Sequence, residues 1–176
     1  MIDKFDGQYG FLSNFSRYGL TWRDEVWPTS EHAFQAAKCV QEMDRLSILH
    51  ADTPGQAKRL GKKIYMRHDW EEIKVPIMEE ILRAKFASQH MQELLLGTGE
   101  DTLVEGNRHH DNIWGDCRCG NFDDEHPQCL KTGTNYLGVL LMKIRGELRA
   151  RLEGEERPTD VQHPGSQQGE AGLSSP

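Results

Sequence analysis

The sequence has few long hydrophobic stretches. Hydrophobic residues make up 36% of the 176 residues, and the longest apolar run covers only residues 136–142. A membrane-spanning helix needs about 20 apolar residues, so we expect no membrane partner. No charged and then apolar leader opens the chain, and we therefore expect no secretory signal.

Cysteine and net positive charge are also scarce. One of the four cysteines is far from the other three, which does not indicate a disulfide framework, so a reducing, cytoplasmic setting is expected. The net charge is −7 and the pI is about 5.6, so the chain lacks the broad positive surface of a general nucleic-acid binder. We therefore expect no stable nucleic-acid complex. One basic helix face is either a local pocket wall or, more usually for such runs, solvated surface: Lys58, Arg59, Lys62, Lys63 and Arg67.

Large hydrophobic residues almost disappear from residue 153 onward. The segment 153–176 has no aromatic residue, and Val161 and Leu173 are its only large aliphatic residues. Such a polar segment buries too little apolar surface to offset the entropy lost on ordering. We therefore predict one folded domain over residues 1–152 and a flexible polar tail over 153–176.

The pattern of apolar and turn residues within 1–152 predicts a mainly helical domain. N-cap residues precede helical runs at Thr29, Thr53, Asp69 and Asn135. Pro76 either opens the third of these helices or kinks it. Extended runs at 20–22 and 26–27 predict a hairpin, residues 103–105 and 112–114 are shorter extended candidates, and residues 1–15 favour an ordered loop. The fold class is therefore α+β, a single domain with short strands.

The segment 27–38 carries the most informative polar pattern. On a helix capped by Thr29, the side chains of Glu31, Gln35 and Lys38 fall within about 60° of one another. A carboxylate and a lysine held on one rigid element are the groups that glycosyl and carbonyl chemistry uses. Taken alone, the pattern is more typical of an ordinary surface helix, because the helix dipole favours an acid near its start and a lysine near its end.

Two further motifs combine aromatic and polar side chains. The motif over residues 10–15 can stack a planar ring and hydrogen-bond a sugar or phosphate, or it can anchor the core. The motif over residues 111–116 places Asp111 three residues before Trp114, as a pocket wall with a neighbouring carboxylate would require. Arg83 and Lys85 add cations to a strongly amphipathic helix, where such residues usually face solvent.

Three cysteines and a histidine lie close together in the sequence. Cys117, Cys119, His126 and Cys129 offer the thiolate and imidazole ligands that tetrahedral zinc prefers. The Cys-x-Cys spacing is irregular for zinc, and reduced structural cysteines are the alternative. No cofactor is expected to be required, and a structural zinc ion remains a hypothesis. His109 and His110 could add ligands, although adjacent histidines rarely share one ion.

Taken together, these motifs resemble the NADAR family, also called YbiA-like. The matching motifs follow one order along residues 9–146: Gly10-Phe11-Leu12-Ser13-Asn14-Phe15; Trp27-Pro28-Thr29-Ser30-Glu31-His32-Ala33-Phe34-Gln35-Ala36-Ala37-Lys38; Trp70 with Met78 and Leu82-Arg83-Ala84-Lys85-Phe86; Leu95, Thr98-Gly99 and Leu103-Val104-Glu105; Asp111 with Trp114-Gly115; and Gly133-Thr134-Asn135-Tyr136-Leu137-Gly138 with Leu141-Met142 and Arg145. The chain departs from shorter family members between Gly115 and Gly133, where its segment is long and acidic.

The resemblance implies an enzyme, an N-glycosidase that hydrolyses a bond to ribose. The favoured substrate is ADP-ribose attached to guanine, in nucleic acid or as the free nucleobase, so that the reaction would reverse ADP-ribosylation. The alternative is a phosphoribosylamino-pyrimidine intermediate of riboflavin synthesis. An alternative of another class is a module that binds NAD or ADP-ribose without turning it over.

The resemblance also assigns site residues. The catalytic candidates are Lys38, Glu31 and Asp111. The substrate-binding candidates share the family's motifs: Phe11, Ser13, Asn14, Phe15, Trp27, His32, Gln35, Lys85, Trp114, Gly115 and Asn135. Among them Trp114, Trp27 and Phe11 are expected to stack on a base or adenine ring.

Two chemical routes fit these residues. In the first, Glu31 or Asp111 activates water for direct hydrolysis. In the second, neutral Lys38 attacks C1′ and forms a Schiff base, which requires its pKa to be lowered by desolvation or by a nearby cation such as Lys85. Resemblance to the family branch that acts on ADP-ribosylated guanine favours the lysine route.

Overall fold

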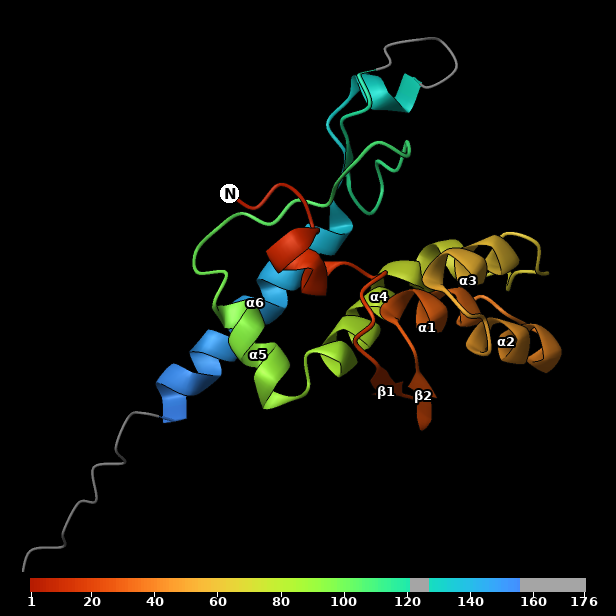
Figure 1. The fold of residues 1–176 in the computed structure, drawn as a ribbon, viewed down its shortest axis with the longest axis horizontal. Helices are drawn as coiled ribbons and strands as arrows, with labels where there is room; N and C mark the ends of the chain where they lie inside the picture. Colours follow the sequence, from red (N-terminus) through yellow and green to blue (C-terminus); the bar gives the residue numbers. More distant parts are fainter. Residues whose placement is uncertain (121–126, 156–176) are drawn as a thin grey trace, which may run out of the picture.

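The computed structural model describes residues 1–120 and 127–155, and their fold is mainly helical with short strands, as predicted. The elements in chain order are η1 (Gly7–Leu12), β1 (Leu20–Trp22), β2 (Glu25–Trp27), α1 (Ser30–Ala36), α2 (Glu42–Leu49), α3 (Pro54–Gly61), α4 (Trp70–Lys85), α5 (Gln89–Leu96), β3 (Gly106–Asn107), β4 (Asp116–Cys117), η2 (Pro127–Leu130) and α6 (Tyr136–Glu155). Helices α1, α2 and α3 gather at one end and α5 and α6 at the other, with α4 between them (Figure 1).

The predicted hairpin is present as the antiparallel pair of β1 and β2. Leu20 lies opposite Trp27, and Arg23 and Asp24 form the turn with φ angles of 51° and 62°. Two consecutive positive φ angles are typical of the two-residue turns that match the twist of a hairpin. Glu25, expected in the turn, is the first residue of β2. The hairpin packs against α4, and its second strand leads directly into α1.

Helix α1 occupies the centre of the packing, against α2, α3 and α4. The Thr29 hydroxyl accepts a hydrogen bond from the backbone N–H of His32, which confirms the predicted cap. All seven residues of α1 are buried, including Glu31 and Gln35. The polar face of this helix is therefore interior, and the interpretation as a surface helix is wrong.

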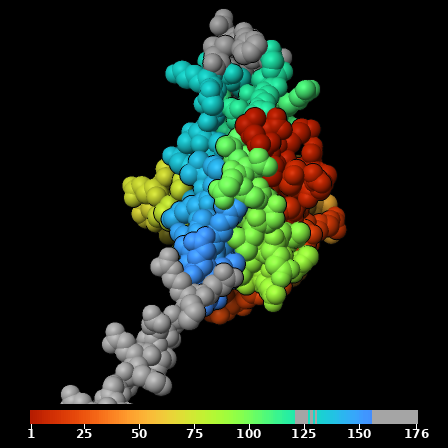
Figure 2. Space-filling model, turned by 90° about the vertical axis from the view of Figure 1, so that its left-hand side faces the viewer, coloured from red at the N-terminus to blue at the C-terminus, as the bar shows by residue number. Residues whose placement is uncertain are grey.

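The longer helices complete the core. Pro76 lies inside α4, which begins at Trp70, so Pro76 does not open this helix. Buried apolar residues of α4, α5 and α6 pack with the aromatic residues of the hairpin and η1. Helix α6 runs along the face shown in Figure 2, beside residues near 100 and the N-terminal segment. There Ile2 forms a bridge with Leu103.

Several element boundaries differ from the sequence-based expectations. Residues 7–12 form a 3-10 helix within the predicted loop, and the short parallel pair is β3 with β4 instead of residues 103–105 and 112–114. Helix α6 continues to Glu155, three residues beyond the predicted domain boundary, and residues 156–176 of the predicted tail lie outside the described residues. No helix of the described ranges has the length and apolarity needed to cross a membrane.

Candidate functional site

A cavity of about 350 Å³ opens where the 13–15 loop, α1, α3, α4, the 105–114 segment and α6 meet. It is lined by residues from all of these parts: Ser13, Asn14, Phe15, Glu31, Phe34, Gln35, Lys38, Lys58, Met78, Glu105, Asn107, His109, Asp111, Trp114 and Leu137. The three predicted catalytic residues are thus brought together, although Asp111 is 73 or more positions from the other two in the sequence.

Gln35 links the two catalytic candidates of the α1 segment. Its Nε2 donates a hydrogen bond of 2.7 Å to Oε1 of Glu31, and its Oε1 accepts one of 2.7 Å from Nζ of Lys38. Glu31 and Gln35 are buried, while Lys38 is half-buried just after the C-cap residue Ala37. The face predicted from helical spacing is therefore a continuous chain of carboxylate, amide and amine.

Burial shifts both ends of this chain toward their uncharged forms. It raises the pKa of Glu31, an effect that the positive charge of Lys58 partly offsets. Burial also lowers the pKa of Lys38, and the charges of Lys58 and Lys62 add to the lowering while Glu31 opposes it. The condition that the lysine route requires is therefore met by desolvation and by Lys58, whereas Lys85, the cation first suggested for it, is not among its causes.

A tight turn presents Asp111 and Trp114 to the cavity. Oδ1 of Asp111 accepts hydrogen bonds from the backbone N–H groups of Ile113 (3.0 Å) and Trp114 (2.9 Å). The ring of Trp114 meets that of Phe34 edge-to-face, with 5.1 Å between centroids. Asn107 braces the same turn, since its Nδ2 donates to the carbonyl of Asp111. The position of the aromatic wall relative to α1 is therefore fixed.

Seven lining residues were not identified from the sequence as site residues. Three are apolar (Phe34, Met78 and Leu137), and four are polar: Lys58, Glu105, Asn107 and His109. Glu105 was noted only as part of a matching motif, and Lys58 only as part of a basic face. Burial, assisted by the charge of Asp111, raises the pKa of Glu105 to about 7. Its Oε2 is buried and has no hydrogen-bond partner within the described residues. A carboxyl group with these properties can exchange a proton near neutral pH.

The 11–15 motif divides between the cavity and the core. Ser13, Asn14 and Phe15 line the cavity, whereas Phe11 is buried edge-to-face against Phe86, with 6.5 Å between centroids. Lys85 is also buried, outside the lining, and donates a hydrogen bond of 2.8 Å to the carbonyl of Ser13. Burial lowers the pKa of Lys85 to about 7. The contact with Ser13 makes Lys85 a support for the loop.

Four other predicted substrate-binding residues also lie outside the cavity lining. Trp27 is buried against Trp22 in the hairpin, and His32 bonds to Oγ1 of Thr29 and the carbonyl of Ala51. The remaining two, Gly115 and Asn135, support the backbone near the site. Of the three rings expected to stack on a substrate, only Trp114 can do so from this position.

Gly115 and Asn135 brace the segment that carries Glu105. A Cβ at Gly115 would collide with the Glu105 carbonyl, so only glycine fits there. Asn135, at φ 53°, accepts a hydrogen bond from the Glu105 N–H and donates one to the Leu103 carbonyl. Its side chain therefore holds the 103–105 segment instead of capping α6.

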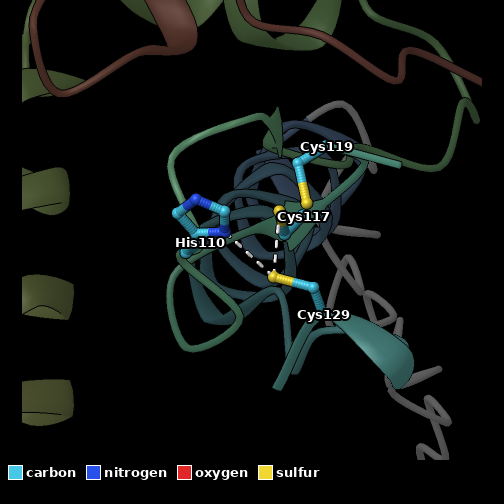
Figure 3. A group of neighbouring side chains, drawn as sticks. All are labelled: His110, Cys117, Cys119 and Cys129. Atoms are coloured by element: carbon cyan, nitrogen blue, oxygen red, sulfur yellow. Dashed lines mark hydrogen bonds between the residues drawn. The ribbon is translucent and has the colours of Figure 1, made fainter. Parts of the chain in front are cut away.

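The cysteine cluster lies next to the cavity rim. The possible metal ligands that the structure brings together are Cys117, Cys119, Cys129 and His110. His110 takes the place predicted for His126, which lies outside the described residues. Figure 3 shows the four side chains converging. Of the two adjacent histidines that could add ligands, His110 lies with the cysteines, whereas His109 lines the cavity.

Comparisons with known proteins agree on one family. The model of the NADAR domain matches residues 2–149. The chain is 39% identical over 150 residues to a protein of Nostoc punctiforme named N-glycosidase Npun_R5314, covering 82% of this chain and 88% of that one. It is 38% identical over 144 residues to N-glycosidase YbiA of Escherichia coli, covering 80% and 82%.

Two more comparisons extend this picture. The chain is 36% identical over 147 residues to riboflavin biosynthesis protein VVA0006 of Vibrio vulnificus, which covers 82% of this chain but only 37% of that longer protein. The NMR structure of Escherichia coli YbiA matches the fold with a TM-score of 0.71 at 34% identity, covering 92% of this chain and 94% of that one.

Proposed function

The chain belongs to the NADAR domain family, and we propose that the bond it cleaves joins ADP-ribose to guanine. Because it is similar over four-fifths of its length to proteins named N-glycosidases, it is a hydrolase of N-glycosyl bonds. The observation that carries this proposal is the chain Glu31–Gln35–Lys38 in the cavity wall. It offers a proton-donating carboxyl group on α1 and a nucleophilic amine on the residue just after the C-cap of that helix.

The proposed reaction begins with neutral Lys38. Its Nζ forms a bond to C1′ of the ribose while the bond from C1′ to the base nitrogen breaks, and the departing base takes a proton from a carboxyl group. Glu31 suits this donor role because burial keeps its proton to higher pH. Glu105, whose pKa is raised to about 7, is the second candidate.

The sugar is then released through a Schiff base. The C1′–O4′ bond breaks, O4′ takes up a proton that Nζ gives up, and the nitrogen lone pair completes the C=N bond. Water adds to C1′, the C1′–Nζ bond breaks as C1′ becomes the carbonyl carbon of the free sugar, and the proton released returns to the carboxylate that protonated the base, which restores both the amine and the acid. Asp111 suits the role of activating this water, because its side chain also lines the cavity. In the alternative route, Glu31 or Asp111 activates water for attack on the glycoside itself.

The cavity also supplies groups that bind the rest of the substrate. Lys58 provides a positive charge for phosphate, while Trp114 and Phe15 offer ring faces or edges for a base. A stacked base contributes on the order of 1–3 kcal/mol. These features suit ADP-ribosylated guanine, and they also suit a phosphorylated ribosylamino-pyrimidine. The name of the Vibrio vulnificus relative favours the latter as the second candidate.

Borohydride trapping tests the lysine route. Reduction during turnover of ADP-ribosylated guanosine should leave a sugar adduct on Lys38, found by mass spectrometry, and Lys38→Ala should abolish both the adduct and guanine release. Lys63→Ala is the matched control, because Lys63 is exposed just after the C-cap of α3 and lies outside the cavity lining. Wild-type protein that turns over without an adduct, or an adduct that survives Lys38→Ala, would refute the Schiff base.

A competition assay tests the substrate and the class of function. The same enzyme is offered ADP-ribosylated guanine and a phosphoribosylamino-pyrimidine together, and the proposal expects the larger kcat/KM for the former. A larger kcat/KM for the pyrimidine would assign the second candidate. Tight binding of both without release of either base would make the protein a module that binds ADP-ribose without turnover.

A further inference from the structure

Four potential metal ligands converge beside the cavity from three separate segments. His110 lies in the turn that leads to Asp111, Cys117 and Cys119 lie in and just after β4, and Cys129 lies in η2. Their ligand atoms all lie within 4.8 Å of one another (Figure 3). None of the four cysteines of the chain is in a disulfide.

Two distances within the cluster are close to those around a tetrahedral ion, and all four ligand atoms lie within 4.8 Å of one another. Sγ of Cys129 lies 3.5 Å from Sγ of Cys117 and 3.2 Å from Nδ1 of His110. Four ligands at zinc bond lengths of about 2.0–2.3 Å would stand about 3.3–3.8 Å apart at the corners of a tetrahedron. A thiol pair at 3.5 Å is well beyond a disulfide bond of about 2.05 Å. The cluster therefore needs only small shifts to surround an ion.

The backbone holds the ligands in place from outside the cluster. His110 has a φ of 62°, an uncommon conformation for a residue with a side chain, and it turns the imidazole toward the cysteines. Oδ1 of Asn112 accepts a 2.7 Å hydrogen bond from the N–H of Cys117. Cys117 and Cys129 are buried, whereas His110 and Cys119 are partly exposed. Two ligands are thus fixed in the interior and two close the site from the solvent side.

We propose that His110, Cys117, Cys119 and Cys129 bind one structural zinc ion. Three thiolates and one imidazole form a closed ligand set of the kind found in structural zinc sites, with no position left for a substrate. Thiolate ligands also disfavour magnesium and calcium, which take oxygen ligands. The ion would join the turn that carries His110 to β4 and η2, and Asn112 already links the same parts through hydrogen bonds to the Cys117 N–H and to the carbonyl of Lys131, just after η2.

The site would fix one wall of the cavity. His110 stands between His109 and Asp111, and both of these neighbours line the cavity. Binding of the ion to His110 therefore sets the position of the Asp111 turn without any contact between ion and substrate. This consequence for turnover rests on the proposed function, whereas the binding of zinc does not.

Metal analysis of the full chain tests the proposal directly. Protein purified from zinc-supplemented cells without chelator should contain one zinc ion per chain, and cobalt introduced after chelation should give the thiolate charge-transfer and visible bands of a tetrahedral site. In Cys119→Ser and His110→Gln we expect the zinc content to fall to about a tenth or less. Cys39→Ser and His90→Gln are the matched controls, because both residues lie outside the cluster, and they should retain full zinc.

Several results would overturn the proposal. These are wild-type protein that neither contains zinc nor gives the cobalt spectrum, ligand variants that keep their zinc, and a disulfide between Cys117 and Cys129 in the freshly purified wild type. The cobalt spectrum of the wild type decides the matter even if a ligand variant fails to fold. Because no substrate is used, the outcome is independent of the N-glycosidase assay.

Discussion

Substitution of Gly61 by alanine should disrupt the hydrogen bonds that join Glu31, Gln35 and Lys38, although Gly61 lies outside the cavity lining. Gly61 is the last residue of α3 and faces Gln35 on α1. A Cβ at this position would lie 2.9 Å from Cδ of Gln35 and 3.0 Å from its Cβ, and closer still to Oε1. Oε1 is the atom that accepts the hydrogen bond from Lys38. The new methyl group and the present position of the amide therefore exclude each other.

The expected loss of stability and of kcat/KM follows from the two ways in which the structure can respond to the added methyl group. If Gln35 stays, overpacking costs about 1–3 kcal/mol. If its amide swings away, two hydrogen bonds to ionisable groups are lost, each contributing about 1.5–3 kcal/mol when the partner is charged. We expect the free energy of unfolding to fall by about 1–3 kcal/mol. We also expect kcat/KM to fall at least about tenfold, since a loss of about 1.4 kcal/mol in transition-state stabilisation has that effect.

Gly146→Ala is the matched control for this experiment. Gly146 also lies in a helix, and a Cβ there meets nothing within 4 Å, so alanine should stabilise the protein by about 0.5–1 kcal/mol. Urea denaturation gives the stability and single-turnover release of the base gives the chemistry. Gly61→Ala combined with Gln35→Ala should show a coupling of at least about 0.5 kcal/mol in stability. A folded Gly61→Ala protein with wild-type kcat/KM would refute the role assigned to Gln35.

Two further predictions use the shifted pKa values. Lys58→Ala removes a charge that lowers the pKa of Lys38, so the acid limb of the kcat/KM profile should move to higher pH. The control variant Lys63→Ala should leave this limb in place. An unmoved limb in Lys58→Ala would contradict the lysine route. Burial lowers the pKa of Lys85 to about 7, so between about pH 7 and pH 9 the unfolded chain binds a proton that the folded chain has released. The free energy of unfolding should therefore rise with pH in this window, and it should rise less steeply in Lys85→Met. Urea denaturation at several pH values measures both slopes. Equal slopes in the two proteins would contradict the lowered pKa of Lys85.

Sequence reasoning succeeded where the determinants are local. The Thr29 cap and the helical spacing after it placed Glu31, Gln35 and Lys38 on one face, because helix geometry depends only on neighbouring residues. The hairpin was found for the same reason. Whether that polar face is exposed or buried depends on α2, α3 and α4, and the local pattern alone favoured the wrong answer.

Other parts of the site depend on contacts between distant segments. The basic run along and just after α3 contains three lysines (Lys58, Lys62 and Lys63), and the packing of α3 on α1 selects Lys58 for the cavity. The motifs named Trp27 and Phe11 but not the direction of their rings, which point into the core. In the same way His126 is nearer to Cys129 in sequence, yet a turn with a positive φ brings His110 to the thiols.

The burial of α1 also bears on how one wall could hold both the proposed nucleophile and the proposed proton donor. In water near neutral pH a glutamate is charged and a lysine is protonated, which is the wrong state of each for the proposed reaction. Desolvation raises the pKa of Glu31 and lowers that of Lys38, so both shifts favour the reactive neutral forms. Gln35 can hydrogen-bond to either pair of protonation states, because its amide both donates and accepts. Position and protonation are therefore set by the same packing, which is why a methyl group on α3 should affect both.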